Sequence, residues 1–220
     1  LKNNYKFEAG TRYFIYVRDL TGKWSKFLLD TDGPQVADEG TVSVTKSGDN
    51  YTCTINSMKF EDEVVSNVST SALNGVEGFT YSANATKESK TKIREVRYNT
   101  TGVDPFADGN SASYSTATKN GNGTYNIPNV TLTSSKTLYI FAQDAYNNVT
   151  AVQYVPVTFD ATAGGRYKKT VIKDNIKEIN MLAVKGEVLK AEQIPSDPKF
   201  NVSTTQKFIK WYKSTDITNK

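Results

Sequence analysis

The sequence predicts a mostly β protein with a β-sandwich at its centre. Among its 220 residues, Thr, Ser, Asn and Val are abundant whereas Leu and Ala are not, which favours strands and turns over helices. Side chains before Asp144 are expected to alternate between two faces, with Leu138, Ile140 and Ala142 on the buried one and Tyr139, Phe141 and Gln143 on the other. Segments of this kind recur at short spacing between Gly, Asn and Asp turns, which is typical of a sandwich.

One stretch of the chain occurs twice. The residues from Asn4 to Asp19 align without a gap with those from Asn129 to Asp144, a shift of 125 residues. Few residues are identical, but the positions expected to face inward stay apolar. Each copy reads as a strand followed by a turn that opens with an aspartate. That aspartate either binds a metal or a partner or accepts hydrogen bonds from turn amides, and its duplication favours the second reading.

Residues 1–30 are predicted to be the C-terminal strands of a preceding sandwich. The strands are expected at Tyr5–Phe7, Arg12–Arg18 and Trp24–Leu29, and three strands are too few to bury a sandwich core. Because Leu1 falls inside a repeat unit, we expect the chain to be a piece of a longer protein. Asp30–Pro34 then marks a boundary, since its Gly-Pro pair interrupts a strand.

Residues 31–162 are predicted to form the central sandwich. Lys119–Gly123 contains two Asn-Gly pairs and predicts a tight hairpin. Lys59–Val65 is expected to be a short helix or an irregular crossover. The strand candidates are Thr41–Thr45, Asn50–Asn56, Gly78–Ala83, Lys92–Tyr98, Ser113–Ala117, Gly123–Asn126, Thr137–Gln143 and Val149–Phe159.

Residues 163–220 are predicted to be a separate small module that follows the hinge-like linker Asp160–Gly165. A unit of about 55 residues has a thin core, so we expect it to lean on a neighbour. The expected elements are strands at Lys168–Lys173, Asn180–Val184 and Phe208–Tyr212 and a short helix within Glu187–Gln193.

The residue inventory argues against an enzyme. The chain has no histidine and one cysteine, Cys53, so neither a Ser-His-Asp nor a Cys-His mechanism is available within it. Cys53 lies in an alternating run and is expected to be a buried strand residue; no cofactor is predicted. The formal charge of +4 is spread along the chain without an aromatic-basic module, which favours a solvated surface over a nucleic-acid partner. No stretch is apolar enough to predict a membrane span.

Two acidic stretches are candidates for calcium binding or acid–base chemistry. Glu61–Glu63 places three carboxylates in a row, and a solvated acidic loop is the favoured reading because no second cluster is marked as converging on it. Asp104–Asn110 alternates oxygen donors with a glycine but lacks the distal glutamate that closes an EF-hand loop. No metal site is therefore predicted.

Exposed aromatic side chains are the best candidates for direct ligand contact, because sugar rings stack on such surfaces. Trp24 and Tyr146 lie at strand ends or turns and are the two candidate contacts. Trp211 lies in the most apolar run of its module and is expected in a core instead.

Three strand-like segments follow one another in the central unit: Lys92–Tyr98, Gly123–Ile127 and Leu138–Asn147. In this order they resemble the immunoglobulin-like domains of bacterial cell-surface proteins, whose last hairpin turn carries an aspartate, then Gly or Asn, then a further Asn, as at Asp144, Asn147 and Asn148. The linker Asp30–Pro34 also matches that family. The resemblance implies an immunoglobulin-like sandwich for residues 31–162 and a partial unit of the same kind at 1–30.

In the C-terminal module, Val184–Leu189, Ile194-Pro195 and Phe208–Tyr212 resemble the B-repeat of internalin-type surface proteins, a small β-grasp module. Lys210 stands where that family usually has a glycine, and the family's closing aromatic-rich strand is absent after Lys220. The resemblance implies a truncated β-grasp-like module at residues 163–220.

Together the resemblances imply a non-enzymatic stalk or adhesion segment of a bacterial surface-exposed multidomain protein, located outside the cell, on its surface or in its wall. Such a segment spaces or presents a binding domain. Its partner would be a host or cell-wall protein or glycan, and the segment itself is expected to be monomeric. Two alternatives stay open: a carbohydrate-binding accessory module of a larger secreted glycosidase, and a self-assembling subunit such as an S-layer protein.

Overall fold

A computed structural model describes residues 13–29, 31–62, 93–109, 113–161, 170–171, 176–200 and 211. These residues form antiparallel strands, and their one helical element is the 3-10 turn η2, Ala191–Gln193. The strands are β1 (Tyr13–Arg18), β2 (Trp24–Leu29), β3 (Gln35–Asp38), β4 (Thr41–Ser47), β5 (Asn50–Glu61), β6 (Ile93–Asn99), β7 (Ser115–Thr116), β8 (Thr118–Lys119), β9 (Tyr125–Thr133), β10 (Leu138–Asp144), β11 (Val149–Asp160), β12 (Thr170–Val171), β13 (Glu178–Val184) and β14 (Lys199–Phe200).

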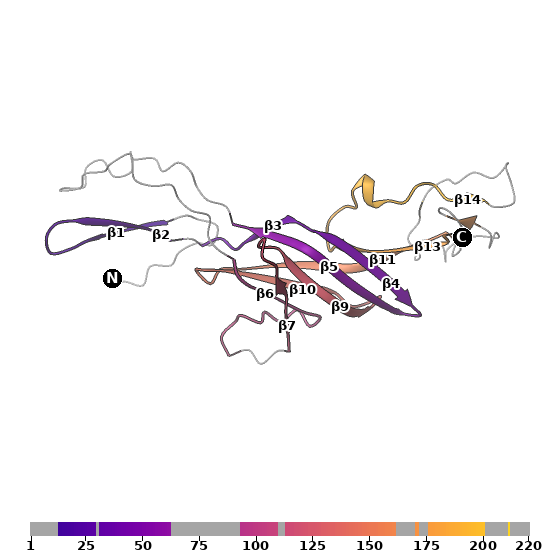
Figure 1. Ribbon diagram of the computed structural model, residues 1–220, viewed down its shortest axis with the longest axis horizontal. Helices are drawn as coiled ribbons and strands as arrows, with labels where there is room; N and C mark the ends of the chain where they lie inside the picture. The colour runs from indigo at the N-terminus through magenta and orange to yellow at the C-terminus, as the bar shows by residue number, and fades with distance from the viewer. Residues whose placement is uncertain are drawn as a thin grey trace.

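Two sheets face each other and form a β-sandwich, as the sequence predicts. The first has the order β3-β5-β9-β8, with β4 also paired to β5, and the second has the order β13-β11-β10-β6-β7. A single hydrophobic core takes side chains from both sheets, including Ile55 and Ile127 from the first and Ile140 and Tyr154 from the second. The molecule is elongated, with β1 and β2 at one end and β14 towards the other (Figure 1).

Strand β5 is longer than the sequence predicts. The helix or crossover expected at Lys59–Val65 is wrong for its first residues, because β5 continues through Glu61 and pairs there with β3. The strand is hard to recognise in the sequence because of Ser57, which has a φ of 60° and introduces an irregularity of one residue. Two exposed positions therefore separate buried Ile55 from buried Met58. This shift hides the period-two pattern, which resumes after Ser57. Residues 63–65 lie outside the described residues.

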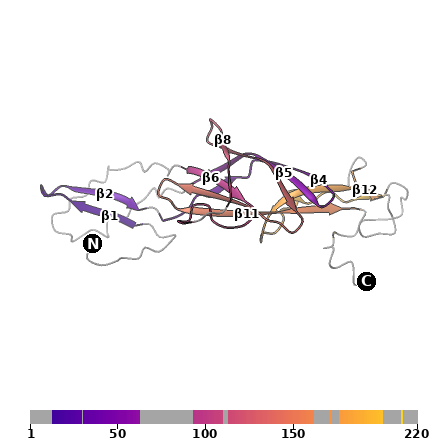
Figure 2. The same ribbon diagram turned by 90° about the horizontal axis from the view of Figure 1, so that it is seen from below.

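The 125-residue repeat is a repeat of structure. In the hairpin β1–β2, Tyr13 lies opposite Leu29. In the hairpin β10–β11, Leu138 lies opposite Tyr154, and these are the positions reached by adding 125 to each number. Every other pair that β1 makes with β2 has its counterpart in the same way. The two hairpins therefore share one register, and Figure 2 shows β1–β2 as a separate ribbon at one end of the molecule.

Strand β10 is buried on both faces, whereas the sequence predicts one buried face. Leu138, Ile140 and Ala142 point into the core as expected, but Phe141 and Gln143 are also buried. The outer face of β10 is covered by side chains of the adjacent strand β6 and of the loop that follows β6. Arg97 lies opposite Phe141 in register, and its guanidinium packs 4.3 Å from the ring of Phe106.

Strand β13 joins the second sheet, although it belongs to the predicted C-terminal module. It pairs with β11 over Tyr154–Asp160, and Leu182 enters the sandwich core. The hydroxyl of Thr158 in β11 donates to Asn180 in β13 (2.7 Å) and accepts from Tyr51 of the first sheet (2.8 Å). The division of the chain at residue 162 stays a prediction, but the two units on either side of it share a sheet.

Several smaller predictions have clear outcomes. The hairpin at Lys119–Gly123 is confirmed: it joins β8 to β9, with Gly123 at a φ of 82°. The helix expected within Glu187–Gln193 is reduced to the three residues of η2. The strands expected at Tyr5–Phe7 and Gly78–Ala83 lie outside the described residues, as does the strand at Phe208–Tyr212 except for Trp211.

Candidate functional site

The repeated aspartates hold the turns of their own hairpins. Oδ1 of Asp144 accepts hydrogen bonds from the backbone amides two and four residues later, those of Tyr146 (2.7 Å) and Asn148 (2.9 Å). Oδ1 of Asp19 accepts from the equivalent amides, those of Thr21 (2.8 Å) and Lys23 (2.9 Å). The structural role favoured by the duplication is therefore confirmed, because each carboxylate satisfies turn amides.

The two candidate ligand contacts belong to different hairpins. Tyr146 lies in the turn between β10 and β11, and half of its surface is exposed. Trp24 is the first residue of β2 and pairs with Arg18. Under the 125-residue shift Trp24 corresponds to Val149 and Tyr146 to Thr21, so the two aromatics are not equivalent positions of the repeat. Tyr146 has the exposure that a ligand contact needs.

The acidic stretches serve local structure. Glu61 lies in β5 and pairs with Lys59, while Asp62 is buried, so the solvated loop expected for Glu61–Glu63 is wrong at these two positions. Oδ1 of Asp104 accepts a hydrogen bond from the backbone amide of Phe106 (2.8 Å), which stabilises a turn. No group of three or more carboxylate or cysteine side chains that could hold a metal ion occurs in the part of the chain that the structure describes.

The single thiol is buried in a strand, as its sequence context predicts. Cys53 is buried in the core between Tyr51 and Ile55 of β5. Burial raises the pKa of the Cys53 thiol to about 11, so the reactive thiolate is scarce at neutral pH.

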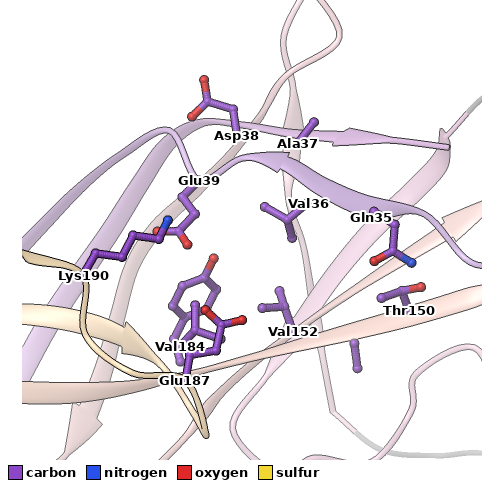
Figure 3. A pocket seen from close by; sticks show the side chains of 12 residues that line it. Gln35, Val36, Ala37, Asp38, Glu39, Thr150, Val152, Val184, Glu187 and Lys190 are labelled. Carbon is purple, nitrogen blue, oxygen red and sulfur yellow. The ribbon is translucent and has the colours of Figure 1, made fainter. Parts of the chain in front are cut away.

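A groove runs between the edges of the two sheets, and we call it the edge groove (Figure 3). Its volume is about 610 Å³. One wall is β3 with the following Glu39, and the other is the first half of β11. At one end the linker closes it, because Gly33 packs directly against Val149 of β11. Beyond the other end, β4 contacts β13, and Lys46 and Glu178 form an ion pair of 3.2 Å.

The walls of the edge groove are strand edges. β3 is an edge strand of the first sheet. β13 pairs with β11 from Tyr154 onward, so within the described part of the chain Val149–Gln153 has a strand partner on one side. The chain leaves β13 at the amide of Lys185, which donates to the carbonyl of Gln153 (2.8 Å). Because backbone groups alternate in direction along a strand, the N–H and C=O of Ala151 point to the same side as that carbonyl.

The floor of the edge groove is apolar except for one hydroxyl. Val36, Val152 and Val184 pack against the sandwich core. Tyr154 lies among them with 1% of its surface exposed, and its hydroxyl has no hydrogen-bond partner among the described residues. A buried hydroxyl that lacks a partner costs about 1–3 kcal/mol. The edge groove therefore contains a polar group that a ligand could satisfy.

The rim of the edge groove is acidic. Asp38, Glu39 and Glu187 carry negative charges and Lys190 one positive charge, which gives −2 in a chain whose formal charge is +4. Figure 3 shows Lys190 and Glu39 pointing toward one another across one end. Burial, and then the charges of Glu39 and Glu187, raise the pKa of Tyr154 far above its ordinary value, so this hydroxyl keeps its proton.

Sequence reasoning missed the edge groove. Its residues come from the start of the central unit, from the last central strand and from the C-terminal module, and no single motif contains them. One signal was present: Val184-Lys-Gly-Glu187 ends a strand and places a carboxylate in the turn that follows. Which strand edge it would face depends on the pairing of β13 with β11.

Comparison of the chain with models of known protein families, with curated proteins and with solved structures gives no match. No helix among the described residues is long and apolar enough to cross a bilayer. Functional inference therefore rests on the geometry of the hairpins and of the edge groove.

Proposed function

We propose that this chain is a non-enzymatic stalk or adhesion segment of a bacterial surface-exposed multidomain protein, in which immunoglobulin-like units and a β-grasp-like module space or present a binding domain. The observation that carries the proposal is the repeated hairpin. β1–β2 and β10–β11 share a register and an aspartate-held turn 125 residues apart. A unit that occurs twice along an elongated chain supports an array of modules (Figure 1).

The chemistry of the chain agrees with a non-enzymatic spacing role. It has no histidine to act as a general base near neutral pH, and its one thiol is buried with a raised pKa. The acidic residues Asp19, Asp104 and Asp144 bind backbone amides of their own turns. These side chains supply structure to loops that would otherwise be free to change conformation.

Small-angle X-ray scattering of the isolated chain tests the spacing role. We expect a particle whose longest dimension is unchanged by ionic strength, because the sheets that set its length are held by a hydrophobic core. Force spectroscopy with handles at the two ends should show a cooperative unfolding event for the sandwich. A compact particle, or a chain that extends without such an event, would contradict a stalk.

The alternative, a carbohydrate-binding accessory module of a larger secreted glycosidase, is favoured by the exposure of Tyr146. Electrophoresis through gels that contain polysaccharide separates the two. We expect no retardation of the wild-type chain. Saturable retardation that is lost in Tyr146→Ala or Trp24→Ala, but kept in Tyr114→Ala, would favour the accessory module; Tyr114 is a similarly exposed tyrosine away from that turn.

A further inference from the structure

We propose that the edge groove binds an extended, basic peptide segment of a partner protein, which adds a strand to β11 and places a lysine or arginine between Glu39 and Glu187. This inference goes beyond the spacing role and does not depend on it, because it uses none of the repeated turns. It rests on three observations: an acidic rim and, among the residues that the structure describes, a strand edge and a buried hydroxyl that both lack a partner.

The strand edge sets the shape of the ligand. β13 pairs with the part of β11 that follows Val149–Gln153, on the same side of β11. A peptide bound beside Val149–Gln153 would therefore lie in line with β13. The linker at Val149 and the amide of Lys185 at Gln153 bound this edge, so at a rise of about 3.3 Å per residue it accepts roughly three extended residues. Unpaired strand edges are the usual templates for an added strand, and main-chain hydrogen bonds supply the affinity. A globular or helical ligand would leave these backbone groups unsatisfied.

The rim sets the charge of the ligand. Glu39 lies at the end of β3 and Glu187 in the turn after β13, so the two carboxylates approach the same space from different sheets. Both residues line the edge groove together with Tyr154. Asp38 is less available to bind a ligand, because its Oδ1 accepts a hydrogen bond from the backbone amide of Gly40 (2.8 Å). One lysine on the rim, Lys190, leaves an excess of negative charge for a cationic side chain.

The floor sets the length of that side chain. Val36, Val152 and Val184 line the space below the carboxylates, and the methylene groups of lysine or arginine would pack on them while the charged end stays at the rim. The hydroxyl of Tyr154 can donate to a peptide carbonyl or accept from an ammonium group. A short or acidic side chain would satisfy neither the apolar floor nor the rim.

Fluorescence anisotropy with labelled peptides tests the proposal. The probe is the acetylated and amidated peptide Thr-Val-Thr-Lys-Thr-Val-Thr, and the matched control has Glu in place of the central Lys. We expect saturable binding of the lysine peptide and binding of the glutamate peptide that is weaker by about tenfold or more. The double variant Glu39→Lys with Glu187→Lys should reverse this preference. Glu192→Lys, on an exposed residue of η2 outside the edge groove, should leave it unchanged.

Two further measurements keep the test decisive if the charge-reversed variant does not fold. Tyr154→Phe removes only the hydroxyl and should weaken lysine-peptide binding severalfold. Amide chemical-shift changes on binding should centre on Val149–Gln153 and Gln35–Asp38. Equal binding of both peptides, no saturable binding, or shift changes elsewhere would overturn the proposal. A dimer of the chain in sedimentation that Glu39→Gln with Glu187→Gln dissociates would also overturn it, because a second copy would then be the occupant.

Discussion

The two hairpins β1–β2 and β10–β11 have the same pairing and the same turn, but they lie in different surroundings. Ile140 and Ala142 of the second are fully buried, whereas their counterparts Ile15 and Val17 are 39% and 51% exposed. Asp144 is buried, and Asp19 is exposed. The comparison shows that local sequence is sufficient for the register and the turn. Burial comes from the sheets that, among the described residues, pack around β10–β11 and not around β1–β2.

The turns show how local this control is. In each turn, the aspartate accepts hydrogen bonds from the backbone amides two and four residues later. The residue three positions after the aspartate has a positive φ, 86° at Gly22 and 70° at Asn147. Glycine and asparagine are the residues that adopt this conformation at the lowest cost. The same solution therefore forms on an exposed ribbon and inside a sandwich.

Core truncation should separate the two hairpins most strongly. We expect Ile140→Ala to lower the free energy of unfolding by about 2–5 kcal/mol, because it leaves a cavity in the core. Ile15→Ala should change it by less than about 0.5 kcal/mol, because that side chain is already exposed. Urea unfolding followed by circular dichroism measures both. Equal losses would mean that the first hairpin is covered in solution.

Removal of the two aspartates should give the next largest difference. Asp144→Ala removes two amide hydrogen bonds and one from the side chain of Asn148, and we expect it to lower the free energy of unfolding by about 2–3 kcal/mol. Asp19→Ala should leave the global transition unchanged and affect only its own turn. Asp144→Asn keeps an acceptor oxygen and should lose less than Asp144→Ala. A global loss in Asp19→Ala would contradict the local role of that turn.

Acid should loosen the first turn at a defined point. The hydrogen bond from the hydroxyl of Thr21, and then that from the amide of Lys23, lower the pKa of Asp19 below its ordinary value of 3.8. The stabilisation is therefore present above the pKa of the unfolded chain and is lost as the pH falls through the lower, folded pKa. The amide shifts of Thr21 and Lys23 should titrate with a midpoint below 3.8, and not at all in Asp19→Asn. A midpoint at or above 3.8 would disagree with the observed hydrogen bonds.

The smallest effect is expected when Asn147 in the second turn is replaced by glycine, the residue at the equivalent position of the first turn. Asn147→Gly places in the second turn the residue found in the first, and we expect a change within about 0.5 kcal/mol in the free energy of unfolding. It removes only a hydrogen bond from Arg94 between exposed side chains. Asn147→Val should destabilise the protein, because a β-branched residue disfavours positive φ. If Asn147→Gly costs as much as Asn147→Val, the asparagine side chain has a role beyond the turn.

Much of the sandwich could be predicted from the sequence because its strands alternate regularly. Leu138, Ile140 and Ala142 face the core as expected, and the Asn-Gly hairpin joins β8 to β9. The exceptions have physical causes. Ser57 breaks the alternation of β5, and Arg97 with Phe106 covers a face of β10 that its sequence presents as the outer one. The covering of β10 depends on residues outside that strand, so the sequence of the strand alone does not predict it.

The edge groove could not be predicted in the same way. Tyr154 has the sequence context of any buried strand tyrosine, and its unpaired hydroxyl becomes informative only beside Glu39 and Glu187. Those residues meet because β13 crosses from the predicted C-terminal module to pair with β11. Long-range strand pairing of this kind leaves no local pattern to read. The aspartates were the reverse case, since their duplication was visible in the sequence alone.

Nuclear Overhauser effects between Hα protons test most directly whether the two hairpins are one repeated building block. Cross-strand residues that exchange no backbone hydrogen bond bring their Hα protons close together. In β10–β11 we expect such contacts for Phe141 with Ala151, and in β1–β2 for Tyr16 with Lys26, the pair 125 residues earlier. Contacts in β1–β2 displaced by one or more residues from this register would contradict the repeat.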